Sequence, residues 1–266
     1  MRVAAETVKG SNGARAVAAP PTVVLGVDIG GSGIKAAPVD VTKGEMVAER
    51  HRIETPQPAT PGAVVETVAA LVKHFEWEGA IGVGFPAVVK AGEVFTAANI
   101  DKKWIGYNAE KSIAEATGSK RVCVLNDADV AGIAEMRFGA GREETGLVLM
   151  ITLGTGIGTA LFINGVLLPN TELGHIEMNS GKEAEAYAAD SAREREDLGW
   201  KEWAERVNKY LLTMEALFWP DLIIVGGGVS KKAEKFLPHL TVKSRILPAA
   251  LRNEAGIIGA ALAAAP

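Results

Sequence analysis

The chain contains three apolar runs that each end in a turn rich in small residues. The runs span residues 22–28, 147–152 and 222–225, and their dense Val, Leu and Ile content is typical of strands buried on both faces. The first two turns lead directly into further apolar segments, residues 34–39 and 157–163. An apolar run, a tight turn and a second apolar run predict a β-hairpin at each of these two places.

Between these segments the apolar residues recur at helical spacing. Val64, Val68, Leu71 and Phe75 lie three or four positions apart, and Thr60 or Pro61 is well placed to begin the helix that they form. Further helices are predicted over residues 108–117, 127–138, 200–219 and 253–264. Further strands are predicted over residues 47–53, 80–85, 94–96 and 122–125. Strands that alternate with helices predict the α/β class.

The repeated hairpin predicts a duplicated architecture with two lobes. We expect a disordered leader over residues 1–21, a small N-terminal α/β lobe over 22–120 and a large C-terminal α/β lobe over 121–252. The alanine-rich helix at residues 253–264 is expected to pack back on the first lobe.

The composition excludes several classes of protein. The 28 Lys and Arg residues face 32 Asp and Glu, which gives a formal net charge of −4, and such a balance offers no electrostatic footprint for nucleic acid or for an anionic membrane. No apolar stretch reaches the roughly 18 residues of a membrane span. The single cysteine, Cys123, has no disulfide partner within the chain, as is typical of a reducing compartment. We therefore expect a cytoplasmic protein without nucleic-acid or membrane partners.

The glycine turns themselves suggest chemistry. Small residues let backbone N–H groups approach a phosphate closely, and Asp28, beside the first turn, could hold a magnesium ion through water. The first turn lies between two strands, whereas the glycines of a dinucleotide fold open a helix. The P-loop pattern is absent. One such turn could merely permit a tight hairpin, but three, including the one at residues 226–228, predict a phosphate site.

Five ordered motifs resemble those of the ROK family of repressors, open reading frames and kinases. They are Val-Asp-Ile-Gly-Gly-Ser-Gly-Ile-Lys at 27–35, Leu-Asn-Asp-Ala at 125–128, Leu-Gly-Thr-Gly-Ile-Gly at 153–158, Glu-Leu-Gly-His at 172–175 and Val-Gly-Gly-Gly-Val at 225–229. The resemblance covers residues 22–264. It implies an actin/hexokinase-like (ribonuclease H-like) sugar kinase, with two lobes and a central active-site cleft.

Within this family, residues 96–106 and 153–179 resemble the branch that uses inorganic polyphosphate. The resemblance implies transfer of a phosphoryl group from polyphosphate or ATP to the 6-hydroxyl of glucose, with mannose as a second sugar, Mg²⁺ as cofactor and a homodimer as assembly. Many family members carry zinc on a His followed by a cysteine-rich run. No cysteine follows His175, so no zinc is expected.

The resemblance also implies roles for individual residues. Asp127 matches the catalytic base, and Asp28 matches the residue that organises Mg²⁺. The implied sugar ligands are Asn99, Asn126, Asp127, Glu172, His175 and Glu185. The implied phosphate and nucleotide residues are Asp28, Gly30, Gly31, Ser32, Gly33, Lys35, Gly154, Thr155, Gly156, Gly226, Gly227 and Gly228.

Some of these residues have simpler interpretations. Asp127 could be a helix N-cap, unless Asn126 supplies the cap. Glu185 could belong to a surface ion pair, since Glu183 lies on the same segment, and Lys35 could lie on a solvated face. A polyphosphate chain would need several cations in a row, and the candidates are Lys102, Lys103, Lys231, Lys232 and Lys235.

Two other functions remain open. An ATP-only hexokinase for another hexose, such as mannose or N-acetylmannosamine, would share the same phosphate turns. A sugar-sensing regulator of the same family would need a helix-turn-helix domain ahead of the first strand, where about twenty residues stand.

Overall fold

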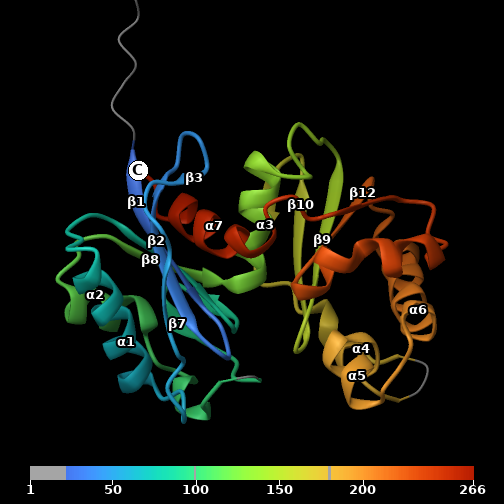
Figure 1. Ribbon diagram of the computed structural model, residues 1–266, viewed down its shortest axis with the longest axis horizontal. Coiled ribbons are helices and arrows are strands. Elements are labelled where there is room, and N and C mark those ends of the chain that lie inside the picture. The colour runs from blue at the N-terminus through green and yellow to red at the C-terminus, as the bar shows by residue number, and fades with distance from the viewer. Residues whose placement is uncertain (1–21, 99, 179–180) are drawn as a thin grey trace, which may run out of the picture.

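The computed structural model describes residues 22–98, 100–178 and 181–266, and it contains two main sheets with two helices between them (Figure 1). This arrangement has the mixed α/β character expected from the sequence. Among the described residues, no helix has the length and apolar character needed to cross a membrane.

The first sheet has the strand order β3-β2-β1-β5-β8, and β4 also pairs with β2. Its strands are β1 (Val23–Ile29), β2 (Ile34–Asp40), β3 (Glu45–Met46), β4 (His51–Ile53), β5 (Ile81–Phe85) and β8 (Val122–Asn126). β1 and β2 form the expected antiparallel hairpin, whereas β1, β5 and β8 run parallel. Parallel strands end at one edge of a sheet, so Gly30, Pro86 and Asp127, which follow these strands, are brought to the same edge.

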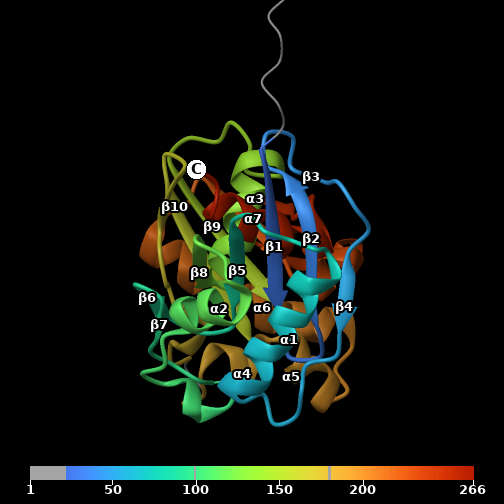
Figure 2. The same cartoon turned by 90° about the vertical axis from the view of Figure 1, so that its left-hand side faces the viewer.

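Two helices cover the outer face of this sheet, α1 (Pro61–His74) and α2 (Ala109–Thr117) (Figure 2). Val64, Val68 and Leu71 of α1 are fully buried in one core cluster with the strands. Asn108 caps α2, since its Oδ1 accepts a hydrogen bond of 2.8 Å from the Lys111 N–H. A small hairpin, β6 (Val89–Lys90) and β7 (Glu93–Val94), follows β5.

The second sheet has the order β11-β10-β9-β12-β13. Its strands are β9 (Leu147–Leu153), β10 (Ile157–Ile163), β11 (Val166–Leu168), β12 (Leu222–Gly226) and β13 (Arg245–Pro248). The helices α4 (Ala184–Ala188), α5 (Asp190–Arg195) and α6 (Trp200–Phe218) lie on its outer side. Short 3₁₀ helices complete the chain: η1 (Lys102–Trp104), η2 (Leu173–His175), η3 (Gly228–Lys235), η4 (Leu237–His239) and η5 (Arg252–Glu254).

Two helices, α3 (Asp127–Phe138) and α7 (Ala255–Ala263), fill the space between the sheets (Figure 1). Their backbones come unusually close to their neighbours. A Cβ on Gly82 of β5 would lie 1.7 Å from the Ala260 carbonyl oxygen, and one on Gly259 would lie 1.6 Å from the Val130 carbonyl oxygen. α7 is therefore in backbone contact with the first sheet and with α3 only because both positions lack a side chain.

The predicted strand at residues 47–53 is wrong as a single element. Met46 of β3 pairs with Val39, and His51 of β4 pairs with Ala36. Four residues lie between Met46 and His51, but only two lie between Ala36 and Val39 of β2, so the edge segment has two extra residues and cannot pair continuously. Pro38 lies opposite the break, and its ring nitrogen has no hydrogen to donate to the ladder. The chain bends at Val47 instead of continuing the strand.

Other boundaries also differ from the sequence-based expectation. The strand predicted at 94–96 is only the two-residue β7, because the Thr96 hydroxyl accepts a hydrogen bond from the Val88 N–H. The boundary predicted at residue 121 would place β8 in the second lobe, but β8 pairs with β5 of the first sheet.

Candidate functional site

A cavity of about 350 Å³ opens between the two sheets, at the ends of β1, β5, β8 and β9. The predicted site residues that line it are Gly30, Gly31, Asn126, Asp127, Gly154, Thr155, Gly156, Glu172, His175, Glu185 and Gly227. Six other predicted site residues are near these in the sequence but do not line the cavity. They are Asp28, Ser32, Gly33, Lys35, Gly226 and Gly228. The predicted sugar ligand Asn99 lies outside the described residues.

Asp127 is the first residue of α3 and lies at the junction with β8. The N-cap of α3 is Asn126, whose Oδ1 accepts hydrogen bonds from the N–H groups of Ala128 (2.8 Å) and Asp129 (3.2 Å). Asp127 is therefore not the cap. Asn126 also donates from Nδ2 to the Ala87 carbonyl oxygen (3.2 Å), so only one N–H of its amide remains for a ligand.

The surroundings of Asp127 suit a proton acceptor. Burial raises the pKa of this carboxyl group to about 7; the negative charges of Asp28 and Glu172 act in the same direction, and a hydrogen bond from the Ala128 N–H opposes them. General bases work best when their pKa lies near the working pH. A half-buried carboxylate with a pKa near neutrality, on the wall of a cavity, can accept a proton from a bound hydroxyl group.

Two cations lie behind the first glycine turn. Lys35 Nζ is 3.4 Å from Asp28 Oδ2, so Lys35 does not point freely into solvent. Its cross-strand partner Arg52 donates to the Ser32 carbonyl oxygen, and a Cβ on Gly33 would lie 2.3 Å from the Arg52 Nε. Sequence reasoning missed Arg52, because only the pairing of β4 with β2 brings it to this turn.

The second and third turns lie against each other. Gly154 N–H donates to the Gly156 carbonyl oxygen (3.0 Å), which closes the turn between β9 and β10. Gly227 has a φ of 83°, and a Cβ there would lie 2.3 Å from the Leu153 carbonyl oxygen. Only glycine allows this approach, which brings the two turns to one wall of the cavity.

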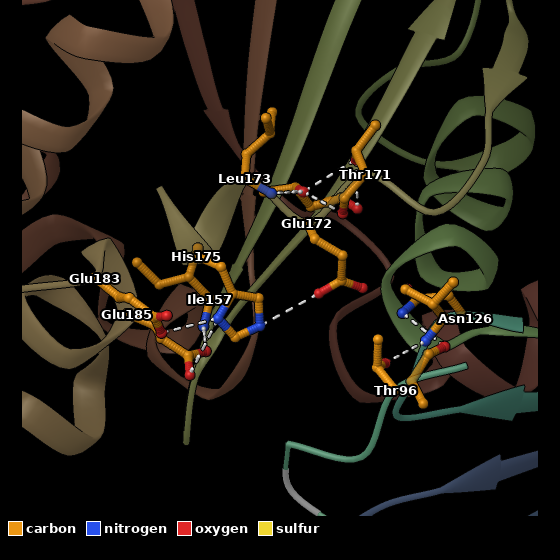
Figure 3. A network of polar contacts seen from close by, with 12 residues as sticks. Thr96, Asn126, Ile157, Thr171, Glu172, Leu173, His175, Glu183 and Glu185 are labelled. Carbon is orange, nitrogen blue, oxygen red and sulfur yellow. Dashed lines mark hydrogen bonds and ion pairs between the residues drawn. The ribbon is translucent and has the colours of Figure 1, made fainter. Parts of the chain in front are cut away.

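Glu172 and His175 form a charged cluster with two further carboxylates (Figure 3). The His175 Nε2 atom lies 3.5 Å from Glu172 Oε2, and its Nδ1 lies 3.0 Å from Glu183 Oε2 and 3.9 Å from Glu185 Oε1. Glu185 Oε2 also accepts from the Ile157 N–H (3.4 Å). Glu185 is thus part of the cavity wall, and the closest ion pair belongs to Glu183, which sequence reasoning did not select.

This cluster shifts the proton affinities of its members. The hydrogen bond with Glu183 raises the pKa of His175, burial opposes the rise, and the charges of Glu185 and Glu172 add to it. Burial raises the pKa of Glu172. Atoms of His175, Glu183 and Glu185 lie within 4.8 Å of one another, close enough for one imidazolium and two carboxylates to satisfy each other. The absence of zinc remains a prediction.

A buried link joins α3 to both sides of the cavity. The carboxylate of Asp129, fully buried, accepts a hydrogen bond of 2.8 Å from the Asn170 N–H. The Asn170 side chain accepts from the Val89 N–H and donates to the Val89 carbonyl oxygen, both at 3.0 Å. Asn170 thus ties the β6 strand to the loop that carries Thr171 and Glu172. The sequence alone did not indicate Asp129 or Asn170 as site residues. Asn170 is 41 positions from Asp129 and 81 positions from Val89, so no local pattern records these hydrogen bonds.

Comparisons with known proteins agree with this arrangement. The model of the ROK family matches residues 24–192. A polyphosphate glucokinase of Mycobacterium tuberculosis (strain CDC 1551 / Oshkosh) is 51% identical over 239 residues, which are 90% of this chain and 90% of the relative.

Two solved structures have the same fold over nearly their whole length. The inorganic polyphosphate/ATP-glucomannokinase of Arthrobacter sp. strain KM has a TM-score of 0.86 and 47% identity, with 90% of this chain and 97% of the other covered. A ROK family glucokinase of Streptomyces griseus, in complex with glucose and AMPPNP, has a TM-score of 0.78 and 26% identity. The match covers 91% of this chain and 99% of the other. Together with the five motifs and the two-sheet architecture, these matches show that the chain belongs to the ROK family of sugar kinases.

Proposed function

We propose that the protein is a polyphosphate- and ATP-dependent glucokinase that phosphorylates the 6-hydroxyl of glucose and accepts mannose as a second sugar. The observation that carries this proposal is the position of Asp127, with its pKa near 7, between glycine turns on one side and the Glu172–His175 cluster on the other. The names of the relatives at 51% and 47% identity support both the sugar and the donors.

In the proposed reaction the glucose O6 attacks the terminal phosphorus of the donor. The proton of the hydroxyl passes to the carboxylate of Asp127, the new O6–P bond forms, and the bond from phosphorus to the bridging oxygen breaks. The remaining donor, shortened by one phosphoryl group, keeps the electron pair of that bond. The Gly30 and Gly154 N–H groups close their own turns, so the N–H groups of Gly31, Thr155 and Gly156 would hold the phosphates in line, which supplies most of the rate in such transfers.

Magnesium is the cofactor that these residues fit. Asp28 and Asp127 are close enough for the charge of one to raise the pKa of the other. Lys35 is paired with Asp28 alone, so a further cation would relieve the remaining negative charge. Mg²⁺ usually binds one or two carboxylates and completes its shell with water and substrate phosphates. Asp28, outside the cavity lining, would hold the ion through water, and the ion would neutralise charge on the transferring phosphoryl group.

The sugar would lie against Asn126, Glu172, His175 and Glu185. Carboxylates accept hydrogen bonds from vicinal hydroxyls, and a protonated imidazole donates to them. Asn99 remains a predicted ligand. The Asp129–Asn170–Val89 link would keep Glu172 at a fixed distance from Asp127.

Replacing Asn170 by Ala should raise the KM for glucose by up to roughly thirtyfold, because two hydrogen bonds of about 1 kcal/mol each are lost. The KM for the donor should change less than the KM for glucose. Steady-state kinetics with each substrate varied in turn measures both values. Asn164→Ala is a matched control, since Asn164 has a similar left-handed backbone (φ 50° against 58°) but lies in the β10–β11 turn. An equal loss in both variants would contradict the role of Asn170.

We also propose a homodimer and a cytoplasmic location. Leu212, Leu217 and Trp219 of the α6 region are exposed by 40%, 62% and 72%, and such apolar exposure favours a protein interface over a solvated face. Size-exclusion chromatography with light scattering should give the mass of two chains, and Trp219→Ser should lower the dimer affinity.

The test of the main proposal measures glucose 6-phosphate formed by the purified protein with Mg²⁺. One reaction contains nucleotide-free polyphosphate and the other contains ATP. Product with both donors is the expected result. Product with ATP alone would remove polyphosphate as a donor and favour the ATP-only hexokinase, in which case mannose and N-acetylmannosamine would be compared with glucose as acceptors.

A further inference from the structure

Three cationic side chains meet at one aromatic ring beside the donor turns. The Arg193 guanidinium carbon lies 4.5 Å from the ring centroid of Trp200, and the ammonium nitrogens of Lys232 and Lys235 lie 5.4 and 5.5 Å from it. The ring itself is packed against Trp203 and Phe236. We call these four residues, Arg193, Trp200, Lys232 and Lys235, the Trp200 cluster.

One cation-bearing segment of the cluster is hydrogen-bonded to a glycine turn, and the other begins at one. In α5, the Ser191 N–H donates to the Gly154 carbonyl oxygen (3.0 Å) and the Ser191 hydroxyl donates to that of Thr155 (2.6 Å). Arg193 follows two residues later. In η3, Lys232 and Lys235 follow Gly228 by four and seven residues, and the segment is kinked at Lys232. The cluster therefore continues outward from the donor turns.

The positive charges of Lys232 and Lys235 are available to bind an anionic ligand. Within the described part of the chain, neither Lys232 nor Lys235 has a carboxylate within 4 Å. Arg193 is held by Asp190 (2.6 Å) and Glu194 (3.2 Å), and Glu234 is the acidic residue between the lysines. Trp200 is partly buried, and a cation over such a ring gains about 0.5–2 kcal/mol, so the contact orients the ammonium groups without neutralising them.

The chemistry of the cluster favours an extended anion over an aromatic base. Cations approach the ring of Trp200, and Phe236 stacks on it with an interplanar angle of 20°, so little of the ring surface remains for a stacked base. Exposed ammonium groups spaced along a segment suit phosphate groups spaced along a chain.

We propose that the Trp200 cluster binds the distal phosphates of an inorganic polyphosphate chain whose terminal phosphoryl group lies at the Gly154–Gly156 turn. The inference rests on the proposed function and extends it to the part of the donor beyond a triphosphate. Lys231, which has no contact with Trp200 among the cation–aromatic pairs of the described residues, and Lys102 and Lys103 of η1 are not part of this site.

The test compares a double variant, Lys232→Gln with Lys235→Gln, with the control Lys73→Gln with Lys120→Gln. The control removes the same charge from exposed lysines of the first lobe. The KM for long-chain polyphosphate should rise by roughly tenfold in the Lys232/Lys235 variant at low salt, and the rise should shrink as salt screens the charges. The KM values for ATP and for glucose should change by less than about twofold, and the control should match the wild type.

The outcomes separate this inference from the proposed function. If the wild type turns over polyphosphate and the Lys232/Lys235 variant does so with the same KM, the proposed role of the Trp200 cluster is wrong and the proposed function stands. An equal rise in KM for ATP and polyphosphate would assign the lysines to the triphosphate itself and also overturn the inference. If the wild type uses only ATP, polyphosphate is added as a competitor of ATP. Inhibition that weakens in the Lys232/Lys235 variant would support the polyphosphate site. No inhibition of the wild type would overturn both the polyphosphate site and the use of polyphosphate as a donor.

Discussion

Replacing Asp127 by Asn should lower kcat by about a thousandfold with either donor, within the 10²–10⁴ range that general bases contribute. The amide keeps the size and one oxygen of the carboxylate but cannot accept the hydroxyl proton. Glucose binding, measured by isothermal titration calorimetry without a donor, should change little, since Glu172, His175 and Glu185 remain. A variant that retains more than a tenth of the wild-type kcat would contradict the role of Asp127 as base.

Asp129→Asn is the matched control. It carries the same change two residues along α3, and its amide oxygen can still accept the hydrogen bond from the Asn170 N–H. Its kcat should stay within about tenfold of the wild type, because it loses no group that contacts the reacting atoms. Equal losses in the two variants would point to the fold of α3, and would count against proton transfer at Asp127.

The same carboxyl group predicts the pH dependence of the reaction. Burial raises the pKa of Asp127 to about 7, and only the deprotonated form can act as base. The kcat/KM for glucose should therefore fall as the pH drops below about 7 and level off above it. The raised pKa also means that the folded protein binds a proton more tightly than the unfolded chain, so stability is lost as the pH rises toward 7. Asp127→Asn should accordingly raise the Tm at pH 8.

Replacing Gly82 or Gly259 by Ala should reduce the free energy of unfolding by about 3 kcal/mol or more, the upper part of the range for overpacked cores. At each position the new Cβ would overlap a backbone carbonyl oxygen, at 1.7 Å from Ala260 and 1.6 Å from Val130. Backbone cannot rotate away as a side chain can, so α7 would have to move off the first sheet or off α3.

Gly62→Ala in α1 is the control, because a Cβ there meets nothing within 4 Å. Alanine is a better helix former than glycine, and this change should be neutral or stabilising by up to about 1 kcal/mol. Urea unfolding followed by circular dichroism measures all three variants. If Gly82→Ala and Gly259→Ala unfold at the wild-type urea midpoint, α7 does not pack as closely against the first sheet and α3 as the structure indicates.

The movement of α7 should also reach the active site. α3 carries Asp127 at its first residue and packs on α7 between the sheets. A shifted α3 would change the position of Asp127 against the turns of the second sheet. Any folded Gly259→Ala protein should therefore lose activity by a larger factor than Gly62→Ala.

The local elements follow from short stretches of sequence. The hairpins at the first two glycine turns and the start of α3 at Asp127 were predicted where they occur, and α1 begins at Pro61, one of its two predicted starts. Each depends on a signal within a few residues: an apolar run, a turn of small residues, a proline or a cap. The ordered motifs then predicted most of the residues that line the cavity.

The contacts between these elements depend on the complete fold. The break between β3 and β4 depends on Pro38 of another strand. Arg52 reaches the first turn only through strand pairing, and the link from Asp129 through Asn170 to Val89 joins segments far apart in the chain. The pKa of Asp127 depends on burial and on the charges of Asp28 and Glu172. A local pattern carries no record of such partners, because packing and electrostatic interactions act through space and depend on which distant segments the fold brings together.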